Sequence, residues 1–259
     1  MPISFDIYPY MNKGITYDSD LNSDYLRWFA KTMDRIGIST SEKRDFKNNY
    51  KELDKLQKEI LIEKDAALAY FFAVEFGYQT HLMQKLILER KSTKYAFHFA
   101  LNVSHADIKA LQSVIANSNK TEYITKFACF IPGANRKLLE PLIIEAGEPK
   151  YAHMYLKYVK GSKGSNLTKL KEIIMESGKP SYLFELAKHL TSLQEIEQIE
   201  DLIIQSNSFT YMRLFAEKVK NANVEKIERA VLASDNSEEI KKFAKYVKKS
   251  RMKQFLLVG

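Results

Sequence analysis

Apolar residues return along this chain with a spacing of about 28 residues. In each copy of the pattern the first residue, which is Tyr in five copies, is followed four residues later by Phe, Tyr or Leu and then, in most copies, by Ala. The first positions, separated by 27, 28, 28, 31, 29 and 28 residues, are Leu68, Tyr95, Tyr123, Tyr151, Tyr182, Tyr211 and Glu239. A fixed period of this length is typical of repeat proteins, in which each short unit buries its apolar side against its neighbours.

Each copy contains two apolar stripes with helical spacing. The copy that begins at Tyr95 has Tyr95, Phe99, Ala100 and Val103 in the first stripe and Ile108, Leu111, Val114 and Ile115 in the second. Separations of one, three and four residues put the members of a stripe on one face of an α-helix. The Ala after the aromatic predicts close packing of the paired helices. A second small position, late in the second helix, predicts that successive repeats interlock: Ser118, Ala146, Ser177, Ser206 and Ser234.

Turn and capping residues fall between the predicted helices. Residues that tolerate a left-handed backbone follow each second helix: Asn119, Gly147, Gly178, Asn207 and Asp235. Pro149 and Pro180 then suit the first turn of the next helix. Between the two helices of a unit, Asp107, Asn135, Asn166 and Asn223 are predicted N-caps, and Ser192 with Glu195 predicts a capping box. The unit is therefore helix, tight turn, helix, turn.

These patterns predict an all-α fold, an α-solenoid of stacked two-helix repeats with a divergent N-terminal cap. We expect residues 1–64 to form an N-terminal arm and divergent capping helices, and residues 65–259 to form the repeat array, which ends in a basic helix. Two segments are open to two interpretations. The aromatic-rich residues 1–19 either cover the end of the first repeat or form a short functional arm, and residues 160–165 are either a loop insertion or a phosphate-contacting loop.

One stretch of the repeat carries a resemblance to known sequences. It reads Ile173-Ile174-Met175-Glu176-Ser177-Gly178-Lys179-Pro180-Ser181-Tyr182, and its second half returns as Tyr211, Phe215-Ala216, Val219 and Ala222-Asn223. This pattern resembles short α-helical repeats in uncharacterised proteins of large DNA viruses, bacteriophages and some bacteria. The resemblance covers about residues 66–259. It implies an α-solenoid and transfers no functional residue to this chain.

The net charge of +8 comes from one end of the chain. Residues 1–64 hold 11 basic and 11 acidic side chains, whereas residues 241–253 hold seven basic side chains and no acidic one. The C-terminal basic residues are Lys241, Lys242, Lys245, Lys248, Lys249, Arg251 and Lys253, and the tyrosines beside lysines and off the main stripe are Tyr246 and Tyr158. This patch is either a solubilising cap or a surface that docks to a phosphate backbone or an acidic protein.

The sequence offers no clear constellation for catalysis. Cys129 is the single cysteine, so no disulfide can form within the chain, and its place after Phe127-Ala128 predicts a buried thiol rather than a nucleophile. The five histidines occupy different repeat positions without metal-ligand spacing, and no Gly-rich nucleotide loop is present. We therefore predict no catalytic, cofactor-binding or metal-binding residues. The recurring tyrosines are predicted to pack in the core rather than to stack on nucleic acid.

Our functional prediction is a non-catalytic α-solenoid scaffold that engages a protein partner, plausibly a host factor in a viral or phage setting. The alternative is a nucleic-acid-binding helical-repeat protein that uses the basic C-terminal helix. A third class, a helical-repeat enzyme such as a HEAT-like DNA glycosylase, would need convergent polar residues that the linear sequence does not reveal. The chain has neither a signal-peptide pattern nor an apolar run long enough to span a bilayer, so we expect a cytoplasmic protein without a membrane partner.

Overall fold

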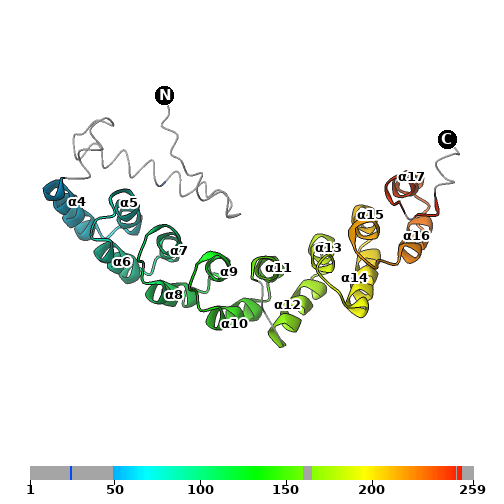
Figure 1. Cartoon of the computed structure of the whole chain (residues 1–259), viewed down its shortest axis with the longest axis horizontal. Helices are drawn as coiled ribbons and strands as arrows, with labels where there is room; N and C mark the ends of the chain where they lie inside the picture. Colours follow the sequence, from blue (N-terminus) through cyan, green and yellow to red (C-terminus); the bar gives the residue numbers. More distant parts are fainter. Residues whose placement is uncertain (1–23, 25–48, 160–164, 249, 253–259) are drawn as a thin grey trace, which may run out of the picture. The chain divides into compact units, whose positions relative to one another are not determined.

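The computed structural model describes residues 24, 49–159, 165–248 and 250–252 (Figure 1). Over these residues it contains fourteen α-helices and no strand, which confirms the all-α prediction. The chain divides into two compact units, residues 1–142 and 143–259, and each is described by itself. The predicted boundary between residues 64 and 65 is not tested, since most of residues 1–48 lie outside the described part.

Unit 1 is built from helices in two layers. Its helices are α4 (Tyr50–Glu63), α5 (Ala66–Phe76), α6 (Thr80–Glu89), α7 (Thr93–Asn102), α8 (Ile108–Ala116), α9 (Thr121–Phe130) and most of α10 (Arg136–Ala146). α5 pairs with α6 and α7 pairs with α8. α5 also contacts α7, which contacts α9, and α6 contacts α8 (Figure 1). We call α5, α7 and α9 the first layer and α6 and α8 the second layer.

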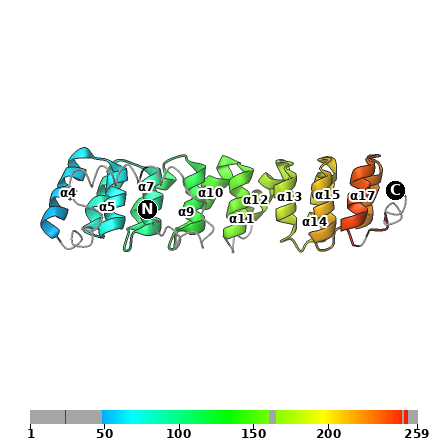
Figure 2. The same cartoon turned by 90° about the horizontal axis from the view of Figure 1, so that it is seen from above.

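Unit 2 repeats this arrangement. Its helices are α11 (Pro149–Tyr158), α12 (Ser165–Glu176), α13 (Pro180–Ala187), α14 (Leu193–Gln205), α15 (Phe209–Lys218), α16 (Val224–Leu232) and α17 (Ser237–Tyr246). The first layer consists of α11, α13, α15 and α17, and each contacts the next. α12, α14 and α16 form the second layer. Figure 2 shows α13, α15 and α17 standing side by side. Each unit is thus a stack of helical pairs whose contacts are made with the preceding and following pair.

The predicted helix starts are largely confirmed. Asp107 accepts a hydrogen bond from the Ala110 N–H, and Asn223 accepts one from the Lys226 N–H. Ser192 caps α14 by accepting from the Glu195 N–H. The first residues of α11 and α13 are Pro149 and Pro180, as predicted. The predicted side-chain caps at Asn135 and Asn166 are not seen in this form. Asn135 precedes α10, but it accepts the Leu138 N–H through its backbone carbonyl. The prediction for Asn166 is wrong, because α12 already begins at Ser165.

The ends of the second helices also follow the prediction. All five turn residues have positive φ: Asn119 (53°), Gly147 (63°), Gly178 (60°), Asn207 (53°) and Asp235 (53°). The serines that precede four of them do more than provide a small side chain. Each donates its hydroxyl to the carbonyl three residues back and accepts the N–H two residues ahead: Ser118, Ser177, Ser206 and Ser234. These hydrogen bonds satisfy carbonyl groups that a helix end leaves unpaired.

A buried polar side chain in the middle of a second-layer helix ties each repeat of unit 1 to the next. The Gln84 side chain accepts the Asp107 N–H at 2.9 Å and donates to the Asp107 carbonyl at 3.4 Å. Gln112 makes the same two bonds with Asn135, at 2.7 Å and 3.3 Å. We call this contact the clamp. It fixes the turn that begins the second-layer helix of the following repeat.

In unit 2 the clamp uses carboxylates. The Glu200 Oε2 accepts the Asn223 N–H at 2.7 Å, and the Glu228 Oε1 accepts the Arg251 N–H at 2.7 Å. Every clamp residue lies 23 residues before its partner and 11 residues before the first position of the next sequence copy. The same position is occupied elsewhere by Gln57, Glu140 and Lys171. The clamp is therefore a third periodic element of the repeat.

Candidate interaction surface

The first-layer helices differ in how much of their surface is buried: α5 and α7 of unit 1 are buried most, whereas α9 of the same unit is buried only in part, as the helices of unit 2 are. In unit 1 the buried residues run without a break over 68–73 in α5 and 95–100 in α7. Six consecutive residues point to every side of a helix, so these stretches of α5 and α7 are covered all round, although Val74 near the end of α5 is exposed. In unit 2 the buried residues of α17 are Phe243 and Ala244. The first layer of unit 2 thus keeps an open side.

The repeated tyrosines pack between neighbouring first-layer helices, as predicted. Tyr95 and Tyr151 are buried, and Tyr123, Tyr182 and Tyr211 are half-buried. Four of them contact the ring that lies two residues after the first position of the preceding copy. The centroid distances are Tyr70–Tyr95 5.7 Å, Phe97–Tyr123 6.0 Å, His153–Tyr182 5.3 Å and Phe184–Tyr211 6.1 Å. Burial lowers the pKa of His153, which keeps this stacked imidazole neutral at pH 7.

The ends of the first-layer helices carry a recurring pair in which Lys is followed directly by Tyr. In each pair the Lys Nζ lies over the ring of its neighbour. The distances to the ring centroid are Lys94–Tyr95 5.6 Å, Lys150–Tyr151 5.3 Å, Lys157–Tyr158 5.3 Å and Lys245–Tyr246 5.4 Å. These are the four places in the whole sequence where Tyr follows Lys. Three of the four pairs belong to the first layer of unit 2. We call this arrangement the Lys–Tyr pair.

The pair in unit 1 holds a carboxylate. Asp24 Oδ2 lies 2.9 Å from the Lys94 Nζ and accepts the Tyr95 hydroxyl at 2.6 Å. Lys94 and Asp24 are each 23% exposed. One carboxylate oxygen therefore receives both an ammonium and a phenol donor, and hydrogen bonds to a charged acceptor are the stronger kind. The Lys94–Tyr95 pair thus holds the carboxylate of Asp24 through both of its side chains.

The predicted C-terminal patch is less positive in three dimensions than along the sequence. Lys242 forms ion pairs with Glu238 at 2.7 Å and Glu239 at 3.0 Å. Arg251 forms an ion pair with Glu225. The described cations that are exposed and outside any ion pair of the described residues are Lys241, Lys245 and Lys248. Lys249 and Lys253 lie outside the described residues.

The two predicted exposed tyrosines are at the surface. Tyr158 is 38% exposed and Tyr246 is 47% exposed. Tyr246 has two cations near its ring, because the Arg213 guanidinium lies 4.9 Å from the centroid in addition to Lys245. A base-stacking platform needs an open ring face. The rings in question are instead paired with cations, which favours an anionic ligand over a stacked base.

The thiol, the possible metal ligands and the helix lengths of the described residues do not indicate another functional site. Burial raises the pKa of the Cys129 thiol to about 12, so it is protonated at neutral pH and a poor nucleophile. Among the residues that the structure describes, no group of three or more His, Cys, Asp or Glu side chains could hold a metal ion. The described helices include none that is both long and apolar enough to cross a bilayer. Residues 160–164 and 1–19, with two open interpretations each, lie outside the described part.

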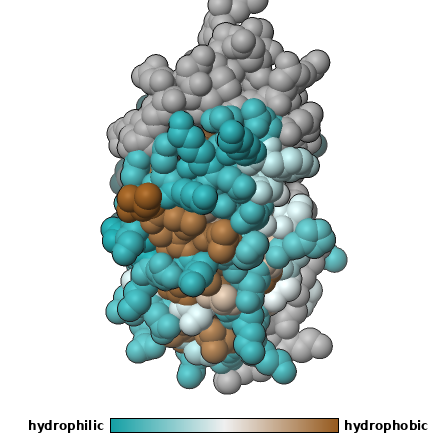
Figure 3. Space-filling model, turned by 90° about the vertical axis from the view of Figure 1, so that its left-hand side faces the viewer, coloured by the Kyte–Doolittle hydropathy of each residue, from teal (hydrophilic) through white to brown (hydrophobic). Residues whose placement is uncertain are grey.

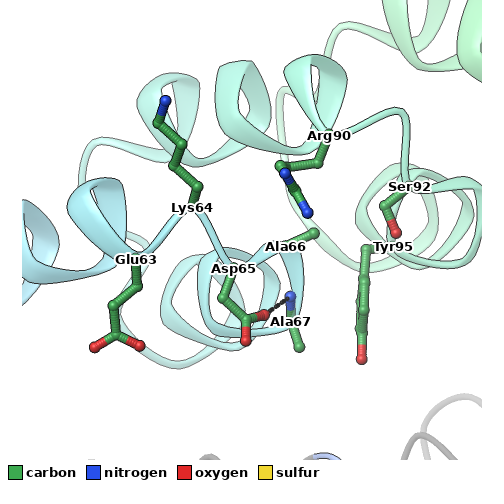
Figure 4. Close-up of a pocket in the computed structure, with 8 residues that line it drawn as sticks. All are labelled: Glu63, Lys64, Asp65, Ala66, Ala67, Arg90, Ser92 and Tyr95. Carbon is green, nitrogen blue, oxygen red and sulfur yellow. Dashed lines mark hydrogen bonds between the residues drawn. The ribbon is translucent and has the colours of Figure 1, made fainter.

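Two further surface features belong to unit 1. A shallow pocket of about 410 Å³ lies between the α4–α5 turn and the α6–α7 turn. Its charged side chains Glu63, Lys64 and Arg90 point in different directions, and Asp65 caps α5 (Figure 4). On α4, Tyr50 is 62% and Ile62 is 80% exposed. Apolar side chains gather within a polar surround on this side of the unit (Figure 3). Neither feature brings converging polar groups together.

Comparison with protein-family models, with curated proteins and with solved structures found no match.

Sequence reasoning missed two features of the structure, the buried clamp and the carboxylate bound by a Lys–Tyr pair. The clamp had a visible signal, since Gln or Glu recurs 11 residues before the first position of most copies. The Lys–Tyr pairs were equally visible, but their partner was not. Asp24 lies 70 residues from Lys94 in the sequence, and no local pattern joins them.

Proposed function

We propose that this protein is a non-catalytic α-solenoid scaffold that binds a protein partner along the open side of the first layer of unit 2. The supporting observation is the difference in burial: α5 and α7 each contain six consecutive buried residues, whereas α11, α13, α15 and α17 contain at most two in a row. Extended surfaces made from successive helices are the binding surfaces that repeat proteins use.

The composition of the open side supports a protein partner. Tyr158 and Tyr246 are exposed, and tyrosine is enriched at protein interfaces because its ring is apolar and its hydroxyl is polar. A single cysteine, Cys129, fits a reducing compartment, which makes the cytoplasm the proposed location. The resemblance to viral and phage repeat proteins makes a host protein the proposed partner.

Nucleic-acid binding through the C-terminal helix is the second candidate function. It is favoured by the exposed ammonium groups of Lys241, Lys245 and Lys248. Three phosphate contacts predict a slope of about −2 for single strands and about −3 for duplex DNA in a plot of log K against log salt concentration. A measured slope in this range, lost when the three lysines become Glu, would favour this candidate over the scaffold.

The scaffold proposal is tested by purifying the tagged full-length protein from its native cells with and without nuclease. We expect a stoichiometric protein that stays bound after nuclease treatment. The double substitution Tyr158→Ala and Tyr246→Ala should release it, while Leu193→Ala with Arg229→Ala on the second layer should not. Leu193 is 66% exposed, so the control removes comparable surface. Recovery of nucleic acid alone would refute the scaffold proposal.

A further inference from the structure

The contact between α15 and α17 departs from the pattern of the other first-layer contacts in unit 2. Where α11 meets α13 and where α13 meets α15, two aromatic rings pack together, with centroids 5.3 Å and 6.1 Å apart. The equivalent positions of α15 and α17 hold Arg213 and Glu239. A departure from an otherwise consistent packing pattern is expected at functional sites.

The two charged residues at this contact do not neutralise each other. Glu239 forms an ion pair with Lys242 at 3.0 Å. The Arg213 guanidinium is half-buried, lies 4.9 Å from the centroid of the Tyr246 ring and forms no ion pair within the described residues. The Lys245 Nζ lies 5.4 Å from the same centroid, and this exposed lysine is likewise outside the ion pairs of the described residues. One exposed ring thus holds two unneutralised cations from neighbouring helices.

The carboxylates of these two helices are all held by lysines. Glu217 lies one helical turn after Arg213, but it pairs with Lys218 at 2.9 Å. Glu238 pairs with Lys242 at 2.7 Å, and the third carboxylate, that of Glu239, pairs with the same lysine. This contact therefore has an excess of positive charge that an external anion would neutralise.

The geometry favours a carboxylate as that anion. A stacked nucleobase needs an open ring face, whereas the Tyr246 ring already lies beside two cations. Arg presents its N–H donors in a planar fork that matches the two oxygens of a carboxylate. We propose that Arg213 and Lys245 bind carboxylates of an acidic segment of the partner protein, and that the Tyr246 ring holds both cations in position. This inference rests on the scaffold function proposed above and names the chemistry of its partner.

A peptide-binding measurement tests this proposal with the full-length protein. The probe is a fluorescein-labelled ten-residue peptide of alternating Glu and Ser, and the matched neutral probe has Gln in place of Glu. We expect saturable anisotropy for the acidic peptide, about fivefold or more weaker binding for the neutral peptide, and weakening in added salt. The double variant Arg213→Gln and Lys245→Gln should weaken binding of the acidic peptide about five- to tenfold.

A matched variant separates recognition from net charge. Lys109→Gln with Lys169→Gln removes the same charge from exposed positions on second-layer helices, and it should weaken binding less than about twofold. Arg213→Lys keeps the charge but loses the planar fork, so binding should fall between wild type and the double variant. Equal losses in the two double variants would overturn the proposal. So would tighter binding of a ten-nucleotide uridine RNA with the same dependence on Arg213 and Lys245.

The role of the ring as a positioning group has its own readout. Tyr246→Phe keeps the ring and should leave acidic-peptide binding unchanged. Tyr246→Ala leaves both cations in the chain but removes the surface that orders them, so it should weaken binding about two- to fivefold, the effect of an exposed cation–π contact. Unchanged binding by Tyr246→Ala, with Arg213 and Lys245 intact, would contradict this role.

The outcome also separates this inference from the scaffold function. If the variant Arg213→Gln and Lys245→Gln still retains the protein partner in the purification from native cells, the scaffold stands and the acidic-segment proposal fails. If wild-type protein does not bind the acidic peptide up to millimolar concentration, the proposal is likewise overturned, while the purification continues to report on the scaffold.

Discussion

Replacing Glu200 by Gln should stabilise this protein at neutral pH. Glu200 is 1% exposed, and its Oε2 accepts the Asn223 N–H. Its Oε1 accepts no hydrogen bond within the described residues and lies 3.6 Å from the Lys226 Nζ. Burial raises the pKa of this carboxyl, against the lowering effects of the Asn223 N–H and Lys226. The ionised side chain is therefore costly to bury.

The clamps of unit 1 show how Gln would fit. Gln84 and Gln112 each accept the partner N–H and donate to the partner carbonyl. A Gln at position 200 can do the same with Asn223, and it removes an oxygen whose missing hydrogen bond costs about 1–3 kcal/mol. The lost attraction to Lys226 is worth less than about 1 kcal/mol, because Lys226 keeps Asp201 at 2.6 Å. We expect a net gain of about 1–2 kcal/mol at pH 7.

The pH dependence distinguishes this explanation from a general effect of charge. A raised pKa means that the folded protein holds the proton of Glu200 more tightly than the unfolded chain does. The contribution of this group to stability is therefore greatest below the unfolded carboxyl pKa of about 4.3, and it falls as the pH rises through the higher folded pKa. The advantage of Glu200→Gln should be small near pH 4 and should reach its full value at pH 7.

Thermal unfolding followed by circular dichroism between pH 4 and pH 8 measures this effect. One kcal/mol corresponds to about 2–4 °C in Tm for a domain of 150–250 residues. Glu197→Gln is the matched control, since Glu197 is exposed on the same helix and should change stability by less than about 0.5 kcal/mol. The reverse change, Gln112→Glu, should destabilise unit 1 at pH 7. A variant Glu200→Gln that is less stable than wild type at pH 7, or whose advantage does not vary with pH, would refute the reasoning.

Three further predictions test other contacts. Asp24→Asn should lower stability by about 1–2 kcal/mol, and a double-mutant cycle with Lys94→Met should give a coupling above about 0.5 kcal/mol; a coupling of zero would contradict the ion pair. Ser206→Ala should cost about 1 kcal/mol in urea unfolding, because the Ile203 carbonyl loses its hydroxyl partner; an unchanged midpoint would make packing the sole role of this serine. Cys129, with its pKa of about 12, should react with iodoacetamide at pH 8 about a thousandfold more slowly than glutathione, and comparable rates would contradict its burial.

Local features of this fold could be predicted because local forces fix them. The left-handed turns at Asn119 and Gly178 follow from backbone sterics, and the helix start at Pro180 follows from the fixed φ of proline. The packing of Tyr182 follows from its place in a helical stripe. Each of these inferences uses residues within one turn of one another, where sequence spacing and spatial distance agree.

Some features could not be predicted because they depend on contacts between residues far apart in the sequence. Others were missed because charges were counted over residues 241–253 alone. Lys242 looked like part of an acid-free run, yet Glu238 lies one helical turn before it and neutralises it. The serines were predicted as small packing residues, since their hydrogen bonds to carbonyls leave no trace in a hydrophobic pattern. The carboxylate ligand of Lys94 is separated from it by 70 residues, and chain spacing gives no information at that range.

The 23-residue span of each clamp has a consequence for how the chain folds. The described clamps and helix pairs join residues that are close in sequence, so these contacts close only short loops, and proteins with such local contacts fold fast. A ribosome adds about 5–20 residues per second, so the partner of a clamp residue is synthesised about 1–5 s after the clamp residue itself. Each repeat can therefore form its clamp hydrogen bonds with the preceding repeat during synthesis. The apolar face of a new helix is then exposed to solvent for seconds, and not until the whole chain has been synthesised.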